Sequence, residues 1–224
     1  MSDELNSHIV KEYGLNAGAS VVCIAASKDF VLAPKGFKPS DNLEGCLSVV
    51  VLGVPISQEA ILNDNTIGFF DMRSSLNEKM TTIAKNVTKQ IKARGYKAKA
   101  INGLGGKYVN GQQFGHISLK HAAELAGLGI IGKNYLLYNS EYGNLLWFSA
   151  VLTTADLTPD KKVKYRICES CNKCVEMCPS KALDDSEIFK KKECSKTVFK
   201  KVNGKWEIMC FLCRKICPNR FGKI

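Results

Sequence analysis

The alternation of apolar and polar residues predicts one long amphipathic helix, from Ser75 to Arg94. Apolar residues recur there at helical spacing, opposite a face that carries lysines. Ser75 followed by Glu78 matches a capping box at the start, and Gly95 is a typical stop. The apolar face consists of Leu76, Met80, Ile83, Ala84, Val87 and Ile91. We therefore expect this face to pack on a core.

Three shorter helices are predicted from the same kind of pattern. One runs from Leu119 to Ala126, with Ser118 as its N-cap and Gly127 as the residue that ends it. The other two cover Asp3 to Tyr13 and Gln58 to Asn63.

Apolar runs rich in β-branched residues predict four strands. They cover Val21 to Ala25, Leu47 to Leu52, Tyr135 to Tyr138 and Leu145 to Leu152. A turn-rich connection, Asn139 to Asn144, joins the last two and favours an antiparallel hairpin. Helices mixed with at least one antiparallel pair indicate an α+β fold.

The composition is that of an ordinary globular protein. The 224 residues are 45% hydrophobic and 24% charged, which excludes disordered and fibrous classes. The longest apolar stretch, Cys46 to Ile56, is about half of the roughly 20 residues that a membrane span needs. The N-terminus MSDELNSHIV has no cationic or apolar export signal. These features predict a cytoplasmic protein without a membrane partner.

Charge and cysteine are concentrated near the C-terminus. The net charge is +11, and from Asp160 onward there are 17 basic and 8 acidic residues. Eight of the ten cysteines lie from Cys168 onward. A cytoplasmic chain does not use such a cluster for disulfides, so metal ligation is the favoured interpretation. We predict two domains, residues 1–159 and 160–224, while a nucleic-acid patch is the alternative explanation of the charge.

The cysteine spacing is typical of ferredoxins that hold two 4Fe-4S clusters. The sequence CESCNKCVEMCP gives a complete Cys-x2-Cys-x2-Cys-x3-Cys-Pro run, and CFLCRKICP gives a second, incomplete run. A structural zinc site also uses paired cysteines, but it needs neither the third cysteine nor the proline. The pattern therefore favours iron-sulfur clusters.

The second run lacks its first cysteine, because Glu207 occupies that position. Cys194 is the remaining candidate, across an insertion of about 15 residues. The crossed ligation of two-cluster ferredoxins then predicts two sets. One set is Cys168, Cys171, Cys174 and Cys217, and the other is Cys178, Cys194, Cys210 and Cys213. Cys23 and Cys46 lie in apolar strands and are interpreted as small buried hydrophobic residues.

A glycine-rich segment follows the predicted helix at Leu119. Gly127, Gly129 and Gly132 formally match G-x-G-x-x-G, but the segment follows a helix and precedes a strand, the reverse of the dinucleotide fingerprint. Nicotinamide binding is excluded on this ground. With Lys133 and Asn134, the loop offers close backbone approach to a flat or anionic ligand. The alternative is that the glycines only close the helix and turn.

The segment SLKHAAELAGLGIIGKNYLLYNSEYGN, followed by both cysteine runs and CPNRFG, resembles epoxyqueuosine reductase. That family is related to the corrinoid-dependent reductive dehalogenases. The resemblance implies a nitroreductase-like sandwich that binds cobalamin, followed by a ferredoxin-like domain. It also implies that the clusters reduce base-off cobalamin while a carboxylic acid supplies a proton. The implied cofactor contacts are Ser118, Lys120, His121, Gly127, Gly129, Gly132, Lys133 and Asn134.

The resemblance assigns the acid to Asp71. The family's acid lies in an R-D-Y-H motif just before the long helix, and Phe70-Asp-Met-Arg73 stands at the similar place without the flanking residues. No D-x-H-x-x-G motif for an axial histidine is present, in agreement with base-off binding. The chain ends at Ile224 without the family's C-terminal helical repeats. We therefore expect a small-molecule substrate, with tRNA as the less favoured one.

The leading hypothesis is an iron-sulfur oxidoreductase that passes electrons through two 4Fe-4S clusters to a corrinoid. A redox protein such as ferredoxin or flavodoxin would supply the electrons, and the resemblance suggests an anaerobic host. One alternative is a noncatalytic electron carrier or reductive activator. The other is a reductase with flavin mononucleotide on the same fold.

Overall fold

A computed structural model describes residues 4–63, 66–103, 105–184 and 189–222, without the side chains of residues 66, 67, 205 and 206. The chain forms two compact units, each built from three segments. The sheet unit comprises Met1–Pro55, Leu76–Gly129 and Trp147–Val163. The cysteine unit comprises Ile56–Ser75, Ile130–Leu146 and Lys164–Ile224. The C-terminal stretch thus shares its unit with two earlier segments, and the ferredoxin-like assignment stays a prediction.

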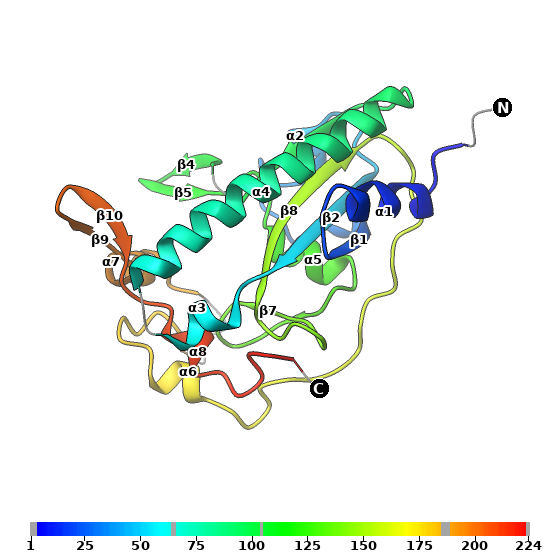
Figure 1. Cartoon of the computed structure of the whole chain (residues 1–224). Coiled ribbons are helices and arrows are strands. Elements are labelled where there is room, and N and C mark those ends of the chain that lie inside the picture. Colours follow the sequence, from blue (N-terminus) through cyan, green and yellow to red (C-terminus); the bar gives the residue numbers. More distant parts are fainter. Residues whose placement is uncertain (1–3, 64–65, 104, 185–188, 223–224) are drawn as a thin grey trace. The chain divides into compact units, whose positions relative to one another are not determined.

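A four-stranded sheet, in the order β1-β2-β8-β3, organises the sheet unit (Figure 1). β1 and β2 are antiparallel, with Val21 opposite Gly53, and β3 and β8 are antiparallel, with Ala98 opposite Thr153. The strands are β1 (Val21–Ala26), β2 (Ser48–Pro55), β3 (Ala98–Ile101) and β8 (Leu146–Thr153). Seven of the eight residues of β8 are buried, which fits a central strand.

The predicted hairpin between residues 135–138 and 145–152 is wrong. β7 (Leu137–Tyr138) pairs with β6 (Ile130–Ile131), whereas β8 pairs with strands of the four-stranded sheet. Asn139 and Gly143 exchange both backbone hydrogen bonds, each 2.8 Å long, and so close the connection into its own small loop. The apolar residues of β8 are buried in the larger sheet instead, so burial overrides the local turn signal.

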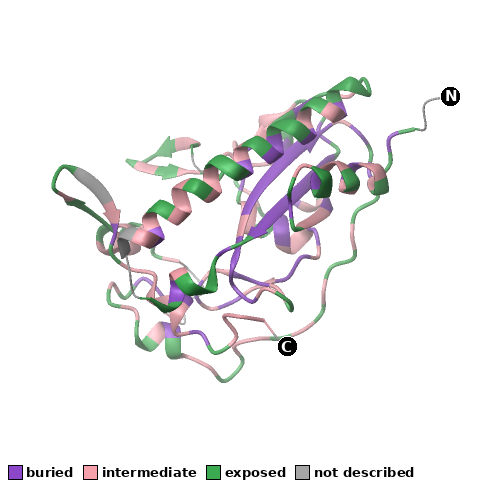
Figure 2. Cartoon of the chain, viewed as in Figure 1, coloured by how far each residue is buried: buried purple, intermediate pink, exposed green. Residues whose placement is uncertain are grey.

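Helices cover both faces of the sheet. α1 (Ser7–Asn16) and α4 (Thr66–Ala93) share one apolar cluster with alternate residues of the strands, while α5 (Leu119–Leu125) contacts β1 and β2. Figure 2 shows β2 and β8 buried along their length and α4 striped between buried and exposed. The cluster includes Val10, Ile24, Val50, Leu52, Val54, Met80, Ile83, Ala84, Val87, Ile91 and Val151. The predicted apolar face of the long helix is therefore confirmed.

The long helix begins earlier than its capping box predicted. α4 starts at Thr66, and Ser75 is an exposed residue inside it. The side chain of Phe69 is buried and lies about two helical turns before Leu76, the first residue of the predicted apolar face. The neighbouring Ser74 hydroxyl donates to the carbonyl oxygen of Phe70, at 3.1 Å, as serines inside helices do. The capping-box assignment is thus wrong because apolar periodicity extends past it.

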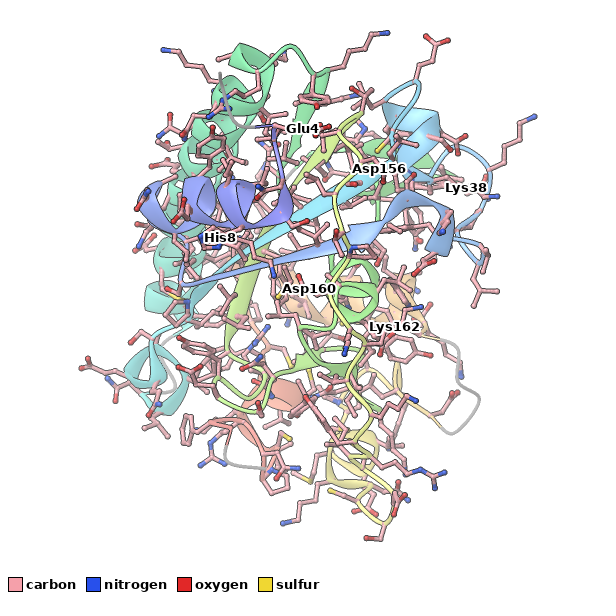
Figure 3. The ribbon with its side chains drawn as sticks, turned by 90° about the vertical axis from the view of Figure 1, so that its right-hand side faces the viewer. Glu4, His8, Lys38, Asp156, Asp160 and Lys162 are labelled. Carbon is pink, nitrogen blue, oxygen red and sulfur yellow. The ribbon has the colours of Figure 1, made fainter. Side chains whose placement is uncertain are left out.

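The segment after β8 protects the open edge of the sheet. Its Asp160 backbone N–H donates to the carbonyl oxygen of Ile24 on β1, at 2.9 Å. The Asp160 carboxylate accepts from the N–H of Ile24 at 2.8 Å and pairs with Lys11 at 2.5 Å. Further along, Lys162 pairs with Asp29 at 3.4 Å. Figure 3 labels Asp160 and Lys162 on this segment. Edge strand β1 is therefore covered by this segment at its centre.

The remaining elements are short. In the sheet unit they are a 3-10 turn (Ser27–Asp29), α2 (Pro39–Asn42) and the hairpin of β4 (Lys107–Val109) and β5 (Gln112–Phe114). In the cysteine unit they are α3 (Gln58–Leu62), α6 (Lys173–Glu176), α7 (Lys191–Val198), β9 (Phe199–Val202), β10 (Lys205–Ile208) and α8 (Leu212–Lys215). The predicted helix at Asp3 begins at Ser7, and Asp3 itself lies outside the described residues.

The architecture is mixed α/β, with helices and antiparallel strands as predicted; the nitroreductase-like sandwich stays a prediction. Among the residues that the structure describes, no helix is both long and apolar enough to cross a membrane. The longest, α4, carries charged residues from Asp71 to Lys92.

Candidate metal centre

The two cysteine runs each fold around a very short helix. α6 contains Cys174 and α8 contains Cys213, and the two helices contact each other. Cys168, at the start of the first run, has a φ of 64°, in the left-handed region that ordinary residues rarely adopt. Such a conformation persists only where the surrounding structure holds it. The runs are therefore shaped as turns that present several thiols in one small region.

The thiols of the first predicted set lie close enough to influence each other, and Cys213 of the second set also influences Cys174. Burial raises the pKa of Cys174 to about 11, and the charges of Cys168, Cys213, Cys217 and Cys171 raise it further. Cys217 is also buried, and the charges of Cys168 and Cys171 likewise raise its pKa. Cys217 thus lies within electrostatic reach of Cys168 and Cys171, although more than 40 residues separate it from them in sequence.

The second set depends on a hairpin that the sequence analysis did not predict. Cys194 lies on α7, which leads directly into the β9-β10 hairpin. After the hairpin, the N–H of Met209 donates to the carbonyl oxygen of Val198 at 2.7 Å, so the chain returns beside α7 just before Cys210. The 15-residue insertion between Cys194 and Cys210 therefore forms the end of α7 and a hairpin, and its last residue lies beside α7 again. Asn203-Gly204 at its tip, both with positive φ, is a signal that could have predicted it.

The electrostatics of Cys213 link the members of this second set. Burial raises the pKa of Cys213 to about 11, Arg214 lowers it, and the charges of Cys194, Cys210 and Cys178 raise it. The structure thus brings a thiol from α7, one from the end of the first run and two from the second run within reach of each other.

Arg214 is a buried cation next to these thiols. Its side chain is 9% exposed and donates to the Asn144 amide oxygen at 3.4 Å. Burial lowers the pKa of Arg214, and the charge of Cys213 raises it. A buried guanidinium is costly unless negative charge lies nearby. An anionic cluster held by four thiolates would supply that charge, so this residue fits an iron-sulfur centre.

The surroundings of Cys178 favour the thiolate. Burial raises its pKa, but hydrogen bonds from the Ser180 side chain and from the backbone of Leu183, Ala182 and Ser180 outweigh burial and lower it. The Sγ to Ser180 Oγ distance is 3.3 Å. Backbone donors gathered on a sulfur are typical of cluster ligands, since they offset the charge of the thiolate.

A buried polar network behind Cys217 was also missed from the sequence. The Tyr138 hydroxyl donates to the Cys217 sulfur and accepts from the side-chain amides of Asn134 at 3.3 Å and Asn144 at 3.1 Å. Burial, followed by Cys217, raises the pKa of Tyr138 above its ordinary value. The sequence did not indicate that the Tyr138 hydroxyl is buried and hydrogen-bonded. The alternation of apolar and polar residues does not show which side chains form hydrogen bonds.

Several of the residues predicted to contact a cofactor pack against or hydrogen-bond to other residues of the chain. A Cβ atom at Gly127 would lie 2.1 Å from the carbonyl oxygen of Lys161, and one at Gly132 would lie 2.9 Å from the Tyr138 ring and 3.2 Å from the Cys168 sulfur. Lys133 donates to the Asn172 side chain at 2.5 Å. Asn134 donates to the carbonyl oxygen of Cys213 at 3.0 Å. Gly132, Lys133 and Asn134 thus line and support the cysteine runs.

The other predicted contacts lie in the sheet unit. Ser118 occupies the N-cap position of α5, as predicted, but its hydroxyl lies 2.6 Å from the Nδ1 atom of His121 rather than on the helix backbone. Burial lowers the pKa of His121, with Lys120 adding to the effect and Glu124 opposing it. Gly129 is buried directly after α5. Their role as corrinoid contacts stays a prediction.

Asp71 lies on the exposed face of α4. The expectation that it precedes the long helix is wrong, because the helix begins at Thr66. The nearby Arg73 lies over the ring of Phe199, with its guanidinium carbon 5.6 Å from the ring centroid. Asp71 as the proton donor stays a prediction.

Within the described residues, no three or more His, Cys, Asp or Glu side chains converge on a point that could hold a single metal ion. A 4Fe-4S cluster makes a different demand, because each thiolate binds a different iron of the cube. Thiols that share an electrostatic neighbourhood without meeting at one point fit this larger group. The donor chemistry of the two sets and the buried cation Arg214 agree with it.

The fold is shared with structures of epoxyqueuosine reductases and of reductive dehalogenases. An epoxyqueuosine reductase in complex with an epoxyqueuosine-modified tRNA stem loop aligns with a TM-score of 0.67 and 18% identity, over 95% of this chain and 64% of that one. A catabolic reductive dehalogenase aligns with a TM-score of 0.68 and 20% identity, over 94% of this chain and 31% of that one. At these identities the likeness concerns the fold.

Curated relatives make the resemblance more specific. The epoxyqueuosine reductase of Prochlorococcus marinus is 34% identical over 109 residues, 43% of this chain and 34% of that protein. That of Lactococcus garvieae is 46% identical over 61 residues, 27% of this chain and 17% of that protein. No family model matches the chain. The resemblance to epoxyqueuosine reductases predicted from the sequence is confirmed, and the match spans less than half the length of these relatives.

Proposed function

We propose that this protein is an iron-sulfur reductase, related to the epoxyqueuosine reductases, in which two 4Fe-4S clusters pass electrons to a corrinoid. The proposal is supported by the gathering of eight cysteines in the cysteine unit, and the division of these cysteines into two sets is part of the proposal. The charges of Cys168 and Cys171 act on Cys217. The β9-β10 hairpin brings the chain back beside α7, and the charge of Cys194 acts on Cys213. This crossed arrangement is the one that two-cluster ferredoxins use.

The residues around the sulfurs support electron transfer rather than substrate chemistry. Arg214 places a buried positive charge beside Cys213, and backbone donors surround Cys178. Both features stabilise negative charge at the sulfurs and so ease the addition of an electron. The surroundings of the two sets differ, which favours two clusters of unequal potential.

The corrinoid is proposed from likeness. A neighbouring structure with a TM-score of 0.60 belongs to a reductive dehalogenase described as B12-dependent. When bound, a corrinoid supplies a reducible cobalt centre next to the substrate. Ser118, Lys120, His121 and Gly129 are the chain's proposed contacts to it. Flavin mononucleotide on the same fold, or no second cofactor in a pure electron carrier, are the competing proposals.

Anaerobic titration of the purified chain with cobalamin and with flavin mononucleotide separates these proposals. We expect a saturable change in the cobalamin spectrum and none in the flavin spectrum. Saturable flavin binding would favour the flavin reductase, and binding of neither would favour the electron carrier. A Ser118→Ala, His121→Ala double variant should weaken cobalamin binding while leaving the iron content unchanged.

Asp71 is proposed as the proton donor in substrate reduction. Asp71→Asn should abolish turnover without changing cluster content or cobalamin binding, because only the transferable proton is lost. Glu78→Gln, an exposed carboxylate on the same helix, is the matched control. Unchanged turnover in Asp71→Asn would remove this residue from the mechanism.

A small molecule is the proposed substrate, and RNA is the second candidate. The likeness to a structure that holds a tRNA stem loop, together with the net charge of +11, favours testing RNA directly. Binding of a tRNA stem loop that weakens steeply with salt would support RNA. Turnover of a free nucleoside without stem-loop binding would support the small molecule.

A hollow beside Cys210 is the proposed docking site of the electron donor. It has a volume of about 460 Å³ and is lined by Pro179, Thr197, Lys200, Met209, Cys210, Phe211, Leu212 and Lys215. An apolar floor with lysines fits an acidic redox protein of the ferredoxin or flavodoxin class, and charge complementarity speeds such encounters. It also leaves a short path to a cluster ligand.

Lys200→Glu with Lys215→Glu should slow reduction by an acidic donor protein at low salt, while reduction by dithionite stays unchanged. Lys85→Glu, exposed on α4, is the control. Equal rates with the donor protein in all variants would place the docking site elsewhere.

A further inference from the structure

The cysteine unit contains a hydroxyl that is aimed at one sulfur of the proposed clusters. Tyr138 is fully buried on β7, and its hydroxyl contacts the Sγ atom of Cys217, a residue of the first set. The two residues are 79 positions apart in sequence, so the contact depends on the tertiary fold. Cys217 also accepts a hydrogen bond from the backbone of Asn219.

The direction of the Tyr138 hydrogen bond follows from its neighbours. The Asn134 amide oxygen accepts from the backbone N–H of Leu136 at 3.1 Å, so its NH2 group must be the side that faces Tyr138. The Asn144 amide oxygen faces the Arg214 guanidinium at 3.4 Å, and so its NH2 group also faces Tyr138. Both amide orientations are thus fixed, because the Leu136 N–H and the Arg214 guanidinium can only donate and must therefore face the amide oxygens.

With two N–H groups pointing at it, the tyrosine oxygen acts as an acceptor twice. Its own proton then has only the sulfur left as a partner among these contacts. A tyrosine hydroxyl is protonated at neutral pH, so it donates its hydrogen bond to the sulfur. The two asparagines therefore act together to hold the O–H bond toward Cys217.

We propose that Tyr138 is a positioning residue that raises the reduction potential of the cluster bound by Cys217, and that Asn134 and Asn144 fix its orientation. The inference rests on the proposed function, because it requires the first cysteine set to hold a cluster. Reduction adds one electron and no proton to the cluster, so its thiolates become more negative. A hydrogen bond to a thiolate stabilises this reduced state more than the oxidised one.

The nearest donors of the two sets differ in kind. Cys178 in the second set receives its hydrogen bonds from Ser180 and from the backbone of residues 180, 182 and 183. Cys217 receives one of its bonds from a tyrosine side chain, which a substitution can remove while the backbone stays in place. Tyr138→Phe therefore isolates the contribution of one hydroxyl to one cluster.

The test is a potentiometric titration of the anaerobic holoprotein with dithionite, followed by electron paramagnetic resonance. In Tyr138→Phe, we expect one of the two one-electron midpoints to become more negative and the other to stay unchanged. A tenfold loss in the reduction equilibrium corresponds to about 59 mV for one electron. Tyr142→Phe, whose hydroxyl bonds to Glu141, is the matched control and should shift neither midpoint.

A second measurement does not depend on how the phenylalanine variant folds. Uniform replacement of tyrosine by 3-fluorotyrosine makes each hydroxyl a stronger donor and keeps its shape. We expect one midpoint to become more positive in the wild-type chain and in Tyr142→Phe.

The outcomes separate this inference from the proposed function. Iron content far below two clusters in the wild-type chain would overturn the proposed function. A full iron content with unshifted midpoints in Tyr138→Phe and in the fluorinated protein would overturn the role of Tyr138 alone. Equal shifts of both midpoints would also overturn it, because they would indicate a general change in the unit.

Discussion

The two units of the chain are stabilised in different ways. The sheet unit buries an almost continuous set of aliphatic side chains, from Val10 on α1 to Val151 on β8. The cysteine unit has short helices and two-stranded ribbons, and its buried positions include Asn134, Asn144, Arg214 and two cysteines. Each buried aliphatic side chain contributes about 1.5–3 kcal/mol to a fold, whereas buried polar groups contribute little net. If the two cysteine sets hold the proposed clusters, this difference predicts that the cysteine unit depends on them for stability more than the sheet unit does.

Removal of the proposed clusters should have the largest effect. It should lower the stability of the cysteine unit and leave that of the sheet unit unchanged. After anaerobic chelation of iron, amide hydrogens of α6, α8 and the β6-β7 ribbon should exchange rapidly, because the cross-links that hold them are gone. Amides of β2 and β8 should stay protected. Hydrogen exchange read by mass spectrometry checks this, with the untreated holoprotein as control. Equal loss of protection in both units would show that the sheet unit does not fold independently of the clusters.

Single cysteine substitutions should each remove one cluster and leave the other. By crossed ligation, Cys217→Ala and Cys168→Ala remove the same cluster, so both variants should retain the same paramagnetic signal. Cys213→Ala and Cys194→Ala should retain the other signal. The measurement is electron paramagnetic resonance of the reduced variants, and Ser195→Ala next to Cys194 is the control. Matching signals in Cys217→Ala and Cys213→Ala would contradict the crossed assignment.

Truncation of the aliphatic core should affect the sheet unit alone. Met80 on α4 is fully buried in the core cluster, so Met80→Ala leaves a cavity and should cost roughly 2–5 kcal/mol of unfolding free energy. Chemical denaturation followed by circular dichroism measures this change. Iron content and the cluster signals should match the wild-type protein. An accompanying loss of iron would mean that the clusters require an intact sheet unit.

The cysteines of the sheet unit should differ in reactivity from those of the runs. Burial, together with the charge of Asp160, raises the pKa of Cys23 to about 11, while Lys11 lowers it. A raised pKa leaves few thiolates at neutral pH, so alkylation of Cys23 should be slow at pH 7. Its rate should rise about tenfold per pH unit until the pH reaches that pKa. Mass spectrometry of peptides labelled with iodoacetamide measures the rates, and a rate independent of pH would contradict this assignment.

The sequence predicted the parts of the fold that depend on regular periodicity. The apolar face of α4 and the strands β1, β2 and β8 were found because their side chains repeat at the helical or strand spacing. The start of α4 was missed because the capping signal at Ser75 lies inside a helix that continues through Phe69. The partner of β7 was missed because strand pairing depends on distant residues rather than on the intervening turn.

The candidate site likewise combines features that the sequence predicted with features that it did not. Cysteine spacing predicted the two runs, because ligand geometry imposes a fixed local pattern, and the assignment of the cysteines to two ligand sets stays a prediction. The asparagine pair around Tyr138 and the burial of Arg214 follow from tertiary packing, so no local pattern indicated them. Lys133 and Asn134 were predicted from their glycine-rich context to face a cofactor, and in the structure they bond to the cysteine runs.

The proposed clusters can be counted by quantifying iron, acid-labile sulfide and zinc in anaerobically purified protein. We expect about eight iron and about eight sulfide per chain, with negligible zinc, because each of the two cysteine sets is proposed to hold one 4Fe-4S cluster. About four iron per chain would contradict the assignment of Cys194 to a second complete set. Zinc in place of iron and sulfide would show that the chain is not an iron-sulfur protein.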